Sequence, residues 1–136
     1  MKFGINFFPS FRPSDCTTAE YYQQCITLAE RADVLGFNSV KTVEHSFYDY
    51  GGHSTNPCIF LSAVAAVTKR IGIFSTVHTP LMSPAYTAKA ITTIDHISHG
   101  RAGLNIVCGW NQDEFDIHGV RIDGEKRYDH GLEWYR

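Results

Sequence analysis

The fold is decided by the stretch Phe3-Gly4-Ile5-Asn6-Phe7-Phe8-Pro9-Ser10-Phe11-Arg12-Pro13. Its first six residues form an almost continuous apolar run, as expected of a strand covered on both faces in a parallel sheet. The rest is a loop that lacks the G-x-G-x-x-G turn with which a dinucleotide-binding sheet follows its first strand. Two architectures compete, an open doubly wound sheet and a (β/α)8 barrel, and this stretch favours the barrel.

Three further strand-then-helix units follow at a regular interval. We predict strands over residues 3–8, 37–43, 71–77 and 103–107, whose starts are separated by 34, 34 and 32 residues. This is the length of a βαβ unit, and its right-handed crossover makes neighbouring strands parallel. A complete barrel has about 250 residues. The chain is therefore predicted to be a single domain over residues 1–136, the N-terminal half of a barrel with about four βα units.

Helix signals stand between the predicted strands. Thr17-Thr18-Ala19-Glu20 has the form of a capping box, and the helix it opens is predicted to end at Gly36. Asn56-Pro57 and Ser83-Pro84 each place a capping residue before proline, opening helices over 58–70 and up to Gly100. Residues 108–123 are predicted to be a polar loop, followed by a helix that starts near Gly124 or Glu125.

Composition and charge indicate a globular protein with a small-molecule partner. Hydrophobic residues make up 43% of the chain, and its net charge is −2, which does not favour nucleic acid or an anionic membrane surface. The four cysteines lie apart without a C-x-x-C pair, so we interpret them as thiols in a reducing cytoplasm. No run of the sequence is long enough for a signal peptide or a membrane span.

The chemistry of a barrel lies in the loops after its strands. The loop after the second strand is the richest, because His45 can transfer protons near neutral pH and lies among carboxylates and aromatic rings. Asn105 lies inside an otherwise apolar strand, so its amide either bonds within the barrel or faces a polar ligand, and we favour the ligand. After it, the small residues Cys108 and Gly109 permit close approach by a planar ligand.

Metal-dependent hydrolysis is the least favoured reading. The candidate zinc ligands are six histidines, His45, His53, His96, His99, His118 and His130, together with Asp and Glu side chains. The spacing of these histidines argues against a zinc site. His96 and His99 are predicted to lie in the last turn of a helix, where the helix dipole favours histidine. We therefore predict no metal.

Several motifs in order along the chain resemble the bacterial luciferase-like family of flavin-dependent monooxygenases. They are Glu44-His45 and Gly100-Arg101-Ala102-Gly103-Leu104-Asn105-Ile106-Val107-Cys108-Gly109-Trp110, supported by Asn56-Pro57, Ser83-Pro84-Ala85 and Asp95-His96-Ile97-Ser98-His99. The resemblance covers essentially the whole chain. It implies a (β/α)8 barrel that uses reduced FMN, supplied by a separate flavin reductase, and O2 to oxidise a small organic substrate. It also implies a homo-oligomer in the full-length protein.

The resemblance also implies roles for particular residues. His45 matches the family's histidine beside the flavin ring and is the predicted catalytic residue. The predicted cofactor-binding positions are Thr76, Asn105, Cys108, Glu114, Arg127 and Tyr128. Ser46 replaces a second histidine of the light-emitting members, so an oxygenase is expected and not a light emitter. The alternatives are a non-catalytic flavin-binding relative, an inactive half-barrel fragment and a deazaflavin-dependent oxidoreductase.

Overall fold

Four parallel strands form one sheet in the order in which they occur along the chain. The computed structural model describes residues 1–53 and 56–136. The strands are β1 (Gly4–Phe7), β2 (Ser39–Thr42), β3 (Gly72–His78) and β4 (Ala102–Val107), and the sheet order is β1-β2-β3-β4. A doubly wound sheet reverses its strand order part-way, whereas a barrel adds each strand beside the last. The sheet therefore confirms the predicted α/β fold with four barrel-like units.

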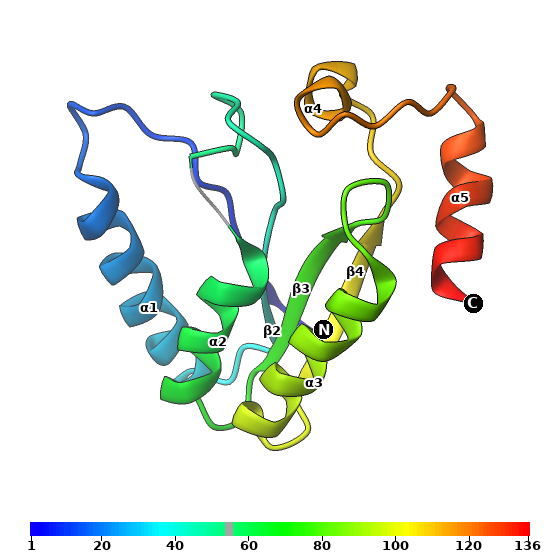
Figure 1. The fold of residues 1–136 in the computed structure, drawn as a ribbon. Coiled ribbons are helices and arrows are strands. Elements are labelled where there is room, and N and C mark those ends of the chain that lie inside the picture. Colours follow the sequence, from blue (N-terminus) through cyan, green and yellow to red (C-terminus); the bar gives the residue numbers. More distant parts are fainter. Residues whose placement is uncertain (54–55) are drawn as a thin grey trace.

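Three helices cover one face of this sheet (Figure 1). They are α1 (Thr18–Val34), α2 (Pro57–Val67) and α3 (Pro84–Ser98), and each returns the chain to the start of the next strand. Two shorter helices follow β4, namely α4 (Gln112–Ile117) and α5 (Lys126–Tyr135). The carboxyl ends of the strands point to the end of the molecule where α4 lies, at the top of Figure 1.

The hydrophobic core lies between the sheet and the three helices. Val40 and Ile73 are paired neighbours on β2 and β3 and are fully buried. Against them pack Leu61 of α2 and Ala29 of α1, also fully buried. Because side chains alternate along a strand, this leaves the residues between them on the opposite face of the sheet.

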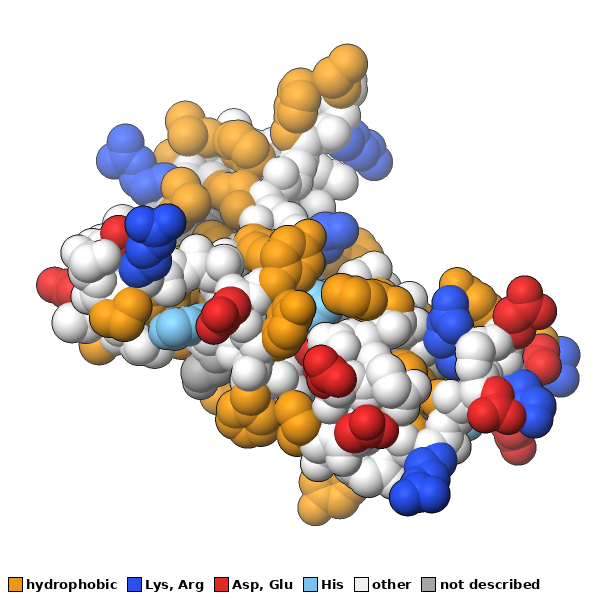
Figure 2. Space-filling view, turned by 90° about the horizontal axis from the view of Figure 1, so that it is seen from above, with side chains coloured by type: hydrophobic (Ala, Val, Ile, Leu, Met, Phe, Trp, Pro, Cys, Tyr) orange, Lys and Arg blue, Asp and Glu red, His pale blue; other side chains and the backbone are white. Residues whose placement is uncertain are grey.

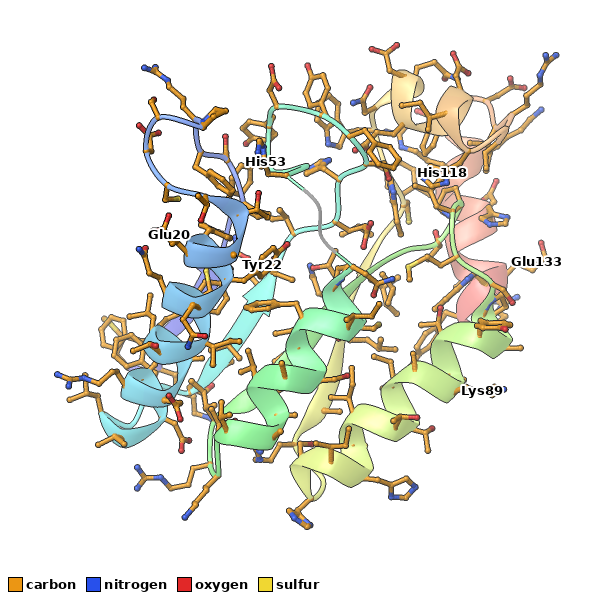
Figure 3. All side chains as sticks on the ribbon, turned by 60° about the vertical axis from the view of Figure 1, so that its left-hand side comes forward. Glu20, Tyr22, His53, Lys89, His118 and Glu133 are labelled. Atoms are coloured by element: carbon orange, nitrogen blue, oxygen red, sulfur yellow. The ribbon has the colours of Figure 1, made fainter. Side chains whose placement is uncertain are left out.

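The helix starts follow the sequence signals closely, with one exception. Thr17 and Glu20 form the predicted capping box at the start of α1, where Figure 3 labels Glu20. Asn56 caps α2 through its side chain. Ser83 precedes α3 in an extended conformation, but its side chain makes no capping hydrogen bond.

The prediction for the end of α2 was wrong by three residues. The helix ends at Val67, not at residue 70, because Thr68 is extended. The backbone N–H groups of Lys69, Arg70 and Ile71 then donate to the carboxylate of Asp33 on α1. This carboxylate replaces the helical hydrogen bonds that the longer helix would have made.

Arg101 links α2, β3 and β4 at the amino-terminal end of these strands. Its guanidinium donates to the carbonyl oxygens of Ala65 and Thr68 at the end of α2, and to that of Ile71 before β3. The last carbonyls of a helix lack partners within it, so a planar cation with several donors satisfies them well. Arg101 thus fixes α2 to the start of β4, at the end of the molecule away from the strand carboxyl ends.

The prediction of a continuous polar loop between β4 and the last helix was also wrong. This segment contains α4, which Asn111 caps by accepting a hydrogen bond from the backbone N–H of Asp113. Phe115 is its buried apolar anchor. A helix of six residues with one buried apolar side chain has no repeating apolar pattern, so the sequence does not predict it.

The sheet face opposite the helices is more polar than a filled barrel interior. Asn6, Lys41, Phe74 and Gly103 are paired across the four strands and therefore share this face. Barrel interiors are usually filled by branched apolar side chains. The large apolar residue in this row is Phe74, whose ring packs over Gly103.

Candidate functional site

A pocket of about 450 Å³ lies at the carboxyl ends of the strands. Figure 2 looks down on this end of the molecule, where hydrophobic side chains gather around the middle of the face. All four strands or the loops that follow them contribute, and α5 closes one side. The lining residues are Asn6, Lys41, Val43, Glu44, His45, Thr76, His78, Asn105, Ile106, Val107, Cys108, Gly109, Trp110, Arg127 and Tyr128.

Six of the seven residues predicted from the sequence line this pocket. Thr76 and Asn105 are paired neighbours on β3 and β4, and the Asn105 side-chain amide donates to the Thr76 hydroxyl at 3.0 Å. Thr76 in turn donates to the carbonyl oxygen of Thr42. The amide of Asn105 therefore bonds within the barrel and also lines the pocket, while its contact with a polar ligand stays a prediction.

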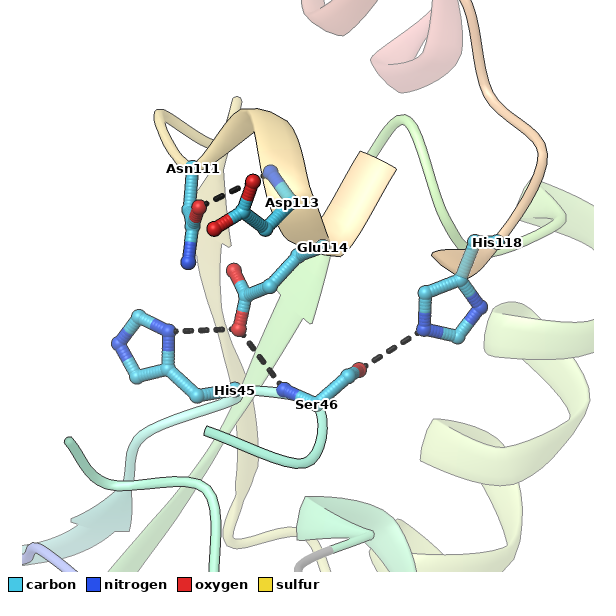
Figure 4. Close-up of polar contacts among 6 residues, drawn as sticks. All are labelled: His45, Ser46, Asn111, Asp113, Glu114 and His118. Carbon is cyan, nitrogen blue, oxygen red and sulfur yellow. Dashed lines mark hydrogen bonds and ion pairs between the residues drawn. The ribbon is translucent and has the colours of Figure 1, made fainter. Parts of the chain in front are cut away.

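Glu114 is the predicted residue that does not line the pocket. It lies behind His45 on α4 and is 1% exposed. One carboxylate oxygen, Oε1, accepts hydrogen bonds from His45 Nδ1 at 3.0 Å and from the backbone N–H of Ser46 at 2.8 Å (Figure 4). Because a carboxylate only accepts, the proton of the neutral imidazole lies on Nδ1, and Nε2 is the nitrogen left to exchange a proton.

A second contact joins the same loop to α4. Ser46 Oγ lies 2.8 Å from Nε2 of His118, the residue that ends α4 (Figure 4). Glu114 and His118 are four residues apart, so they lie on one side of the helix. The loop after β2 is thus held to α4 at two consecutive residues, His45 and Ser46.

Aromatic rings flank His45. The rings of Tyr50 and Trp110 both meet it edge-on, with centroids 5.8 and 6.2 Å away. Trp110 is 63% exposed and lines the pocket, so its ring offers apolar surface to a bound molecule. Such rings favour planar partners through stacking.

The sequence reading missed Glu44 as a site residue. Its carboxyl lines the pocket, and burial raises its pKa to about 8, with the negative charge of Glu114 adding to the effect. Glu44 therefore holds a proton at neutral pH. The signal available in the sequence was its position beside His45 at the end of β2.

His78 was also missed. It ends β3, is 3% exposed and lines the pocket, and its ring packs on Phe115. Burial lowers its pKa, an effect that Glu114 partly opposes. Its Nδ1 is buried without a hydrogen-bond partner among the residues that the structure describes. A histidine at a strand end was the available signal.

Arg127 and Tyr128 approach the pocket from the first turn of α5. The guanidinium lies 4.6 Å from the centre of the Tyr128 ring and donates to the Gly124 carbonyl and the Tyr128 hydroxyl. Its Nε is buried and has no partner among the described residues. The unpartnered N–H group of Arg127 is therefore available to an anionic group in the pocket. Arginine binds carboxylate and phosphate groups in a bidentate manner.

The histidines weighed as zinc ligands do not form a cluster. Within residues 1–53 and 56–136, no three His, Cys, Asp or Glu side chains come together in a metal-binding arrangement. The hydrolase alternative gains no support from this geometry. All four cysteines are free thiols, as predicted.

Comparison with known proteins identifies the family. The whole chain, residues 1–136, matches the family described as luciferase-like monooxygenase. The chain belongs to the luciferase-like monooxygenase family. It is 36% identical over 133 residues to pyrimidine monooxygenase RutA of Rhizobium rhizogenes, covering 90% of this chain and 34% of the relative. The RutA protein of Yersinia enterocolitica is 35% identical, covering 94% and 34%.

Two solved monooxygenase structures have the same fold over nearly the whole of this chain. The monooxygenase RslO1 from Streptomyces bottropensis superposes with a TM-score of 0.90 at 38% identity, covering 98% of this chain and 41% of that one. The oxygenating constituent of 3,6-diketocamphane monooxygenase from Pseudomonas putida, solved in complex with FMN, gives 0.86 at 28% identity, covering 99% and 37%. The chain spans about a third of the length of the two RutA relatives.

Proposed function

We propose that this chain forms part of a flavin-dependent monooxygenase that uses reduced FMN and O2 to oxidise a small organic substrate. The observation that carries the proposal is the His45–Glu114 pair at a pocket that is also lined by Thr76, Asn105 and Arg127. Family membership and a relative solved with FMN support the same conclusion. Residues 1–136 are proposed to be one domain, the N-terminal half of the barrel.

The residues present fit FMN. Thr76 and Asn105 offer polar atoms beside the pocket, Trp110 offers an aromatic face, and the small residue Cys108 leaves room for a ring. The unpartnered Nε of Arg127 suits the phosphate or the ribityl chain. Reduced FMN, when bound, supplies the electrons that activate oxygen.

His45 is proposed to manage protons in this pocket. Glu114 fixes the proton of its neutral ring on Nδ1 and stabilises the ring when Nε2 takes up a second proton. The rings of Tyr50 and Trp110 both pack edge-on against the imidazole. Glu44 holds its own proton at neutral pH, so a second proton source lies in the same pocket.

The relatives suggest the class of substrate. Two of them are named pyrimidine monooxygenases, and pyrimidines are small, planar and polar. The exposed ring of Trp110 and the amide of Asn105 suit such a molecule. We therefore propose a small planar organic substrate, with a separate flavin reductase supplying the reduced cofactor. A deazaflavin remains the alternative cofactor.

The protein is proposed to act in the cytoplasm. The full-length protein is proposed to be a homo-oligomer. Four free thiols fit a reducing compartment. None of the described helices is long and apolar enough to cross a bilayer. On the outer side of the helices, Ile59 is 72% exposed and Tyr86 is 77% exposed, and both line one mostly apolar surface hollow. A contiguous exposed apolar patch of this kind marks a contact surface.

Anaerobic titration with reduced FMN tests the proposal. The protein is expected to bind reduced FMN, and His45→Gln is expected to keep binding while the bound flavin reacts with oxygen more slowly. His53→Gln, outside the pocket, serves as the control. No binding of either FMN or a deazaflavin would contradict the proposal. Binding without any substrate oxidation across a panel of pyrimidines would favour the non-catalytic relative.

A further inference from the structure

Lys41 is a charged residue in a part of the barrel that is usually apolar. It lies in the middle of β2, between Asn6 and Phe74 of the neighbouring strands, on the face away from the helices. Its side chain is exposed and lines the same pocket as His45 and Asn105. No sequence motif had pointed to this residue.

Within the described residues, Lys41 has no anionic partner. The ion pairs there are His45–Glu114 and Lys126–Asp123. Because Lys41 is exposed towards the pocket and no described carboxylate forms an ion pair with it, its positive charge remains free to attract an anion. The pocket is therefore suited to a ligand that brings a negative charge.

The other charged residues of the pocket also favour an anionic ligand. Arg127 is its second permanent cation, and Glu44 is the carboxyl group that lines it. Burial and the charge of Glu114 raise the pKa of Glu44 to about 8, so this group is largely neutral at pH 7. Glu114 itself lies outside the lining and faces His45. The pocket therefore has an excess of positive charge.

We propose that Lys41 stabilises the anionic ring of reduced flavin and so makes the pocket prefer reduced FMN over oxidised FMN. This rests on the function proposed above. The oxidised isoalloxazine ring is neutral, whereas the reduced ring loses a proton from N1 near neutral pH and becomes an anion. A cation beside the ring stabilises only the reduced form, and charge near N1 is one of the means by which a protein tunes a flavin. Arg127, at the α5 side, is left for the phosphate.

The test compares the two redox states of bound flavin in wild-type protein, Lys41→Met, Lys41→Arg and Lys89→Met. Lys89 is exposed on the outer side of α3, where Figure 3 labels it, and is the matched control. Dissociation constants for oxidised and reduced FMN are measured anaerobically, together with the midpoint potential of the bound flavin. Lys41→Met is expected to reduce the preference for reduced FMN about tenfold, which lowers the two-electron potential by about 30 mV. Lys41→Arg and Lys89→Met are expected to keep the wild-type preference.

Three results would overturn the assignment in different ways. An unchanged preference in Lys41→Met, with reduced FMN still bound, contradicts the role of Lys41 and leaves the proposed function standing. An unchanged preference with a lower melting temperature contradicts the role as well and shows that the side chain serves the stability of the fold. Failure of the wild-type protein to bind either form of FMN contradicts the proposed function itself, and with it this inference.

Discussion

At the residue scale, Glu114 lies outside the pocket lining and is hydrogen-bonded to the lining residue His45. Glu114→Gln keeps the shape and one oxygen that accepts from Nδ1, but removes the negative charge that stabilises a protonated imidazole. We expect the reaction of bound reduced FMN with oxygen to slow by about 10²-fold. Affinity for reduced FMN is expected to stay nearly unchanged, because Glu114 does not line the pocket.

Asp113 provides the matched control for this variant. It precedes Glu114 on α4, but its side chain is exposed. Stopped-flow absorbance between pH 6 and 9 follows the reaction of Glu114→Gln and Asp113→Asn. A Glu114→Gln protein with the rate and pH profile of the wild type would show that the carboxylate serves only to hold the loop.

Glu44 makes the stability of the fold depend on pH. Its folded-state pKa of about 8 lies above the ordinary value of 4.5. The folded state therefore binds this proton more tightly than the unfolded state, so the contribution of Glu44 to stability falls as the pH rises from 4.5 to 8. Glu44→Gln is expected to raise the melting temperature at pH 8 to 9, with the gain shrinking towards pH 5.

The exposed carboxylate of Glu30 on α1 is the control for Glu44. Glu30→Gln removes a charge that is already in water, so its effect on the melting temperature is expected to stay constant over this range. Thermal unfolding monitored by circular dichroism gives both curves. A constant difference between Glu44→Gln and the wild type would contradict the protonated state of the half-buried Glu44.

The sequence could reveal candidate residues but not how they connect. His45 and Asn105 were found because a polar residue at or within a barrel strand is informative by position alone. The place of Glu114 behind His45 depends on α4 folding over a loop 68 to 69 residues away in the chain. The sequence marks Glu44 and His78 only by their positions at strand ends and does not mark Lys41, because the significance of all three lies in burial and in the charges around them.

At the scale of elements, strands were easier to predict than the segment after β4. The third and fourth strands were predicted within a residue of their ends, because each is a run of mostly apolar residues between polar turns. The end of α2 was missed since a carboxylate from another helix, Asp33, captures the backbone beyond it. Such a tertiary contact leaves no local pattern.

The position of α5 depends on one helical glycine. A Cβ at Gly131 would come within 2.6 Å of Cys108 Sγ, a pocket residue. Gly131→Ala improves helix propensity by about 1 kcal/mol, but the overpacking costs about 1–3 kcal/mol. We therefore expect a net loss of stability and a weaker affinity for FMN, because α5 carries Arg127.

A double-mutant cycle isolates this contact. Cys108→Ala removes the sulfur atom, so Gly131→Ala in that background is expected to stabilise the protein. Leu132→Ala, at a position 52% exposed on the same helix, controls for changes in α5 that do not meet Cys108. Urea unfolding measures all four proteins of the cycle and the control. Equal effects of Gly131→Ala with and without the sulfur would contradict the close packing.

At the scale of the whole molecule, the described half-barrel has two open edges. The outer edges of β1 and β4 are not paired with another strand within the described residues. Unpaired strand edges associate with other chains. The face away from the helices is polar at Asn6 and Lys41, contrary to the expectation of an apolar interior, but Phe74 is 39% exposed there.

Residues 1–136 produced alone are therefore expected to associate, mainly through the strand edges. Size-exclusion chromatography with light scattering is expected to show species larger than a monomer. Lys substituted for Ile106, which is 36% exposed on β4, is expected to reduce that association, because an edge charge opposes strand pairing. Lys substituted for Val34, which is 74% exposed on the outer side of α1, is the control and should leave association unchanged. A monodisperse monomer that melts cooperatively would show instead that the polar face and the Arg101 and Asp33 contacts suffice to hold four units as an independent fold.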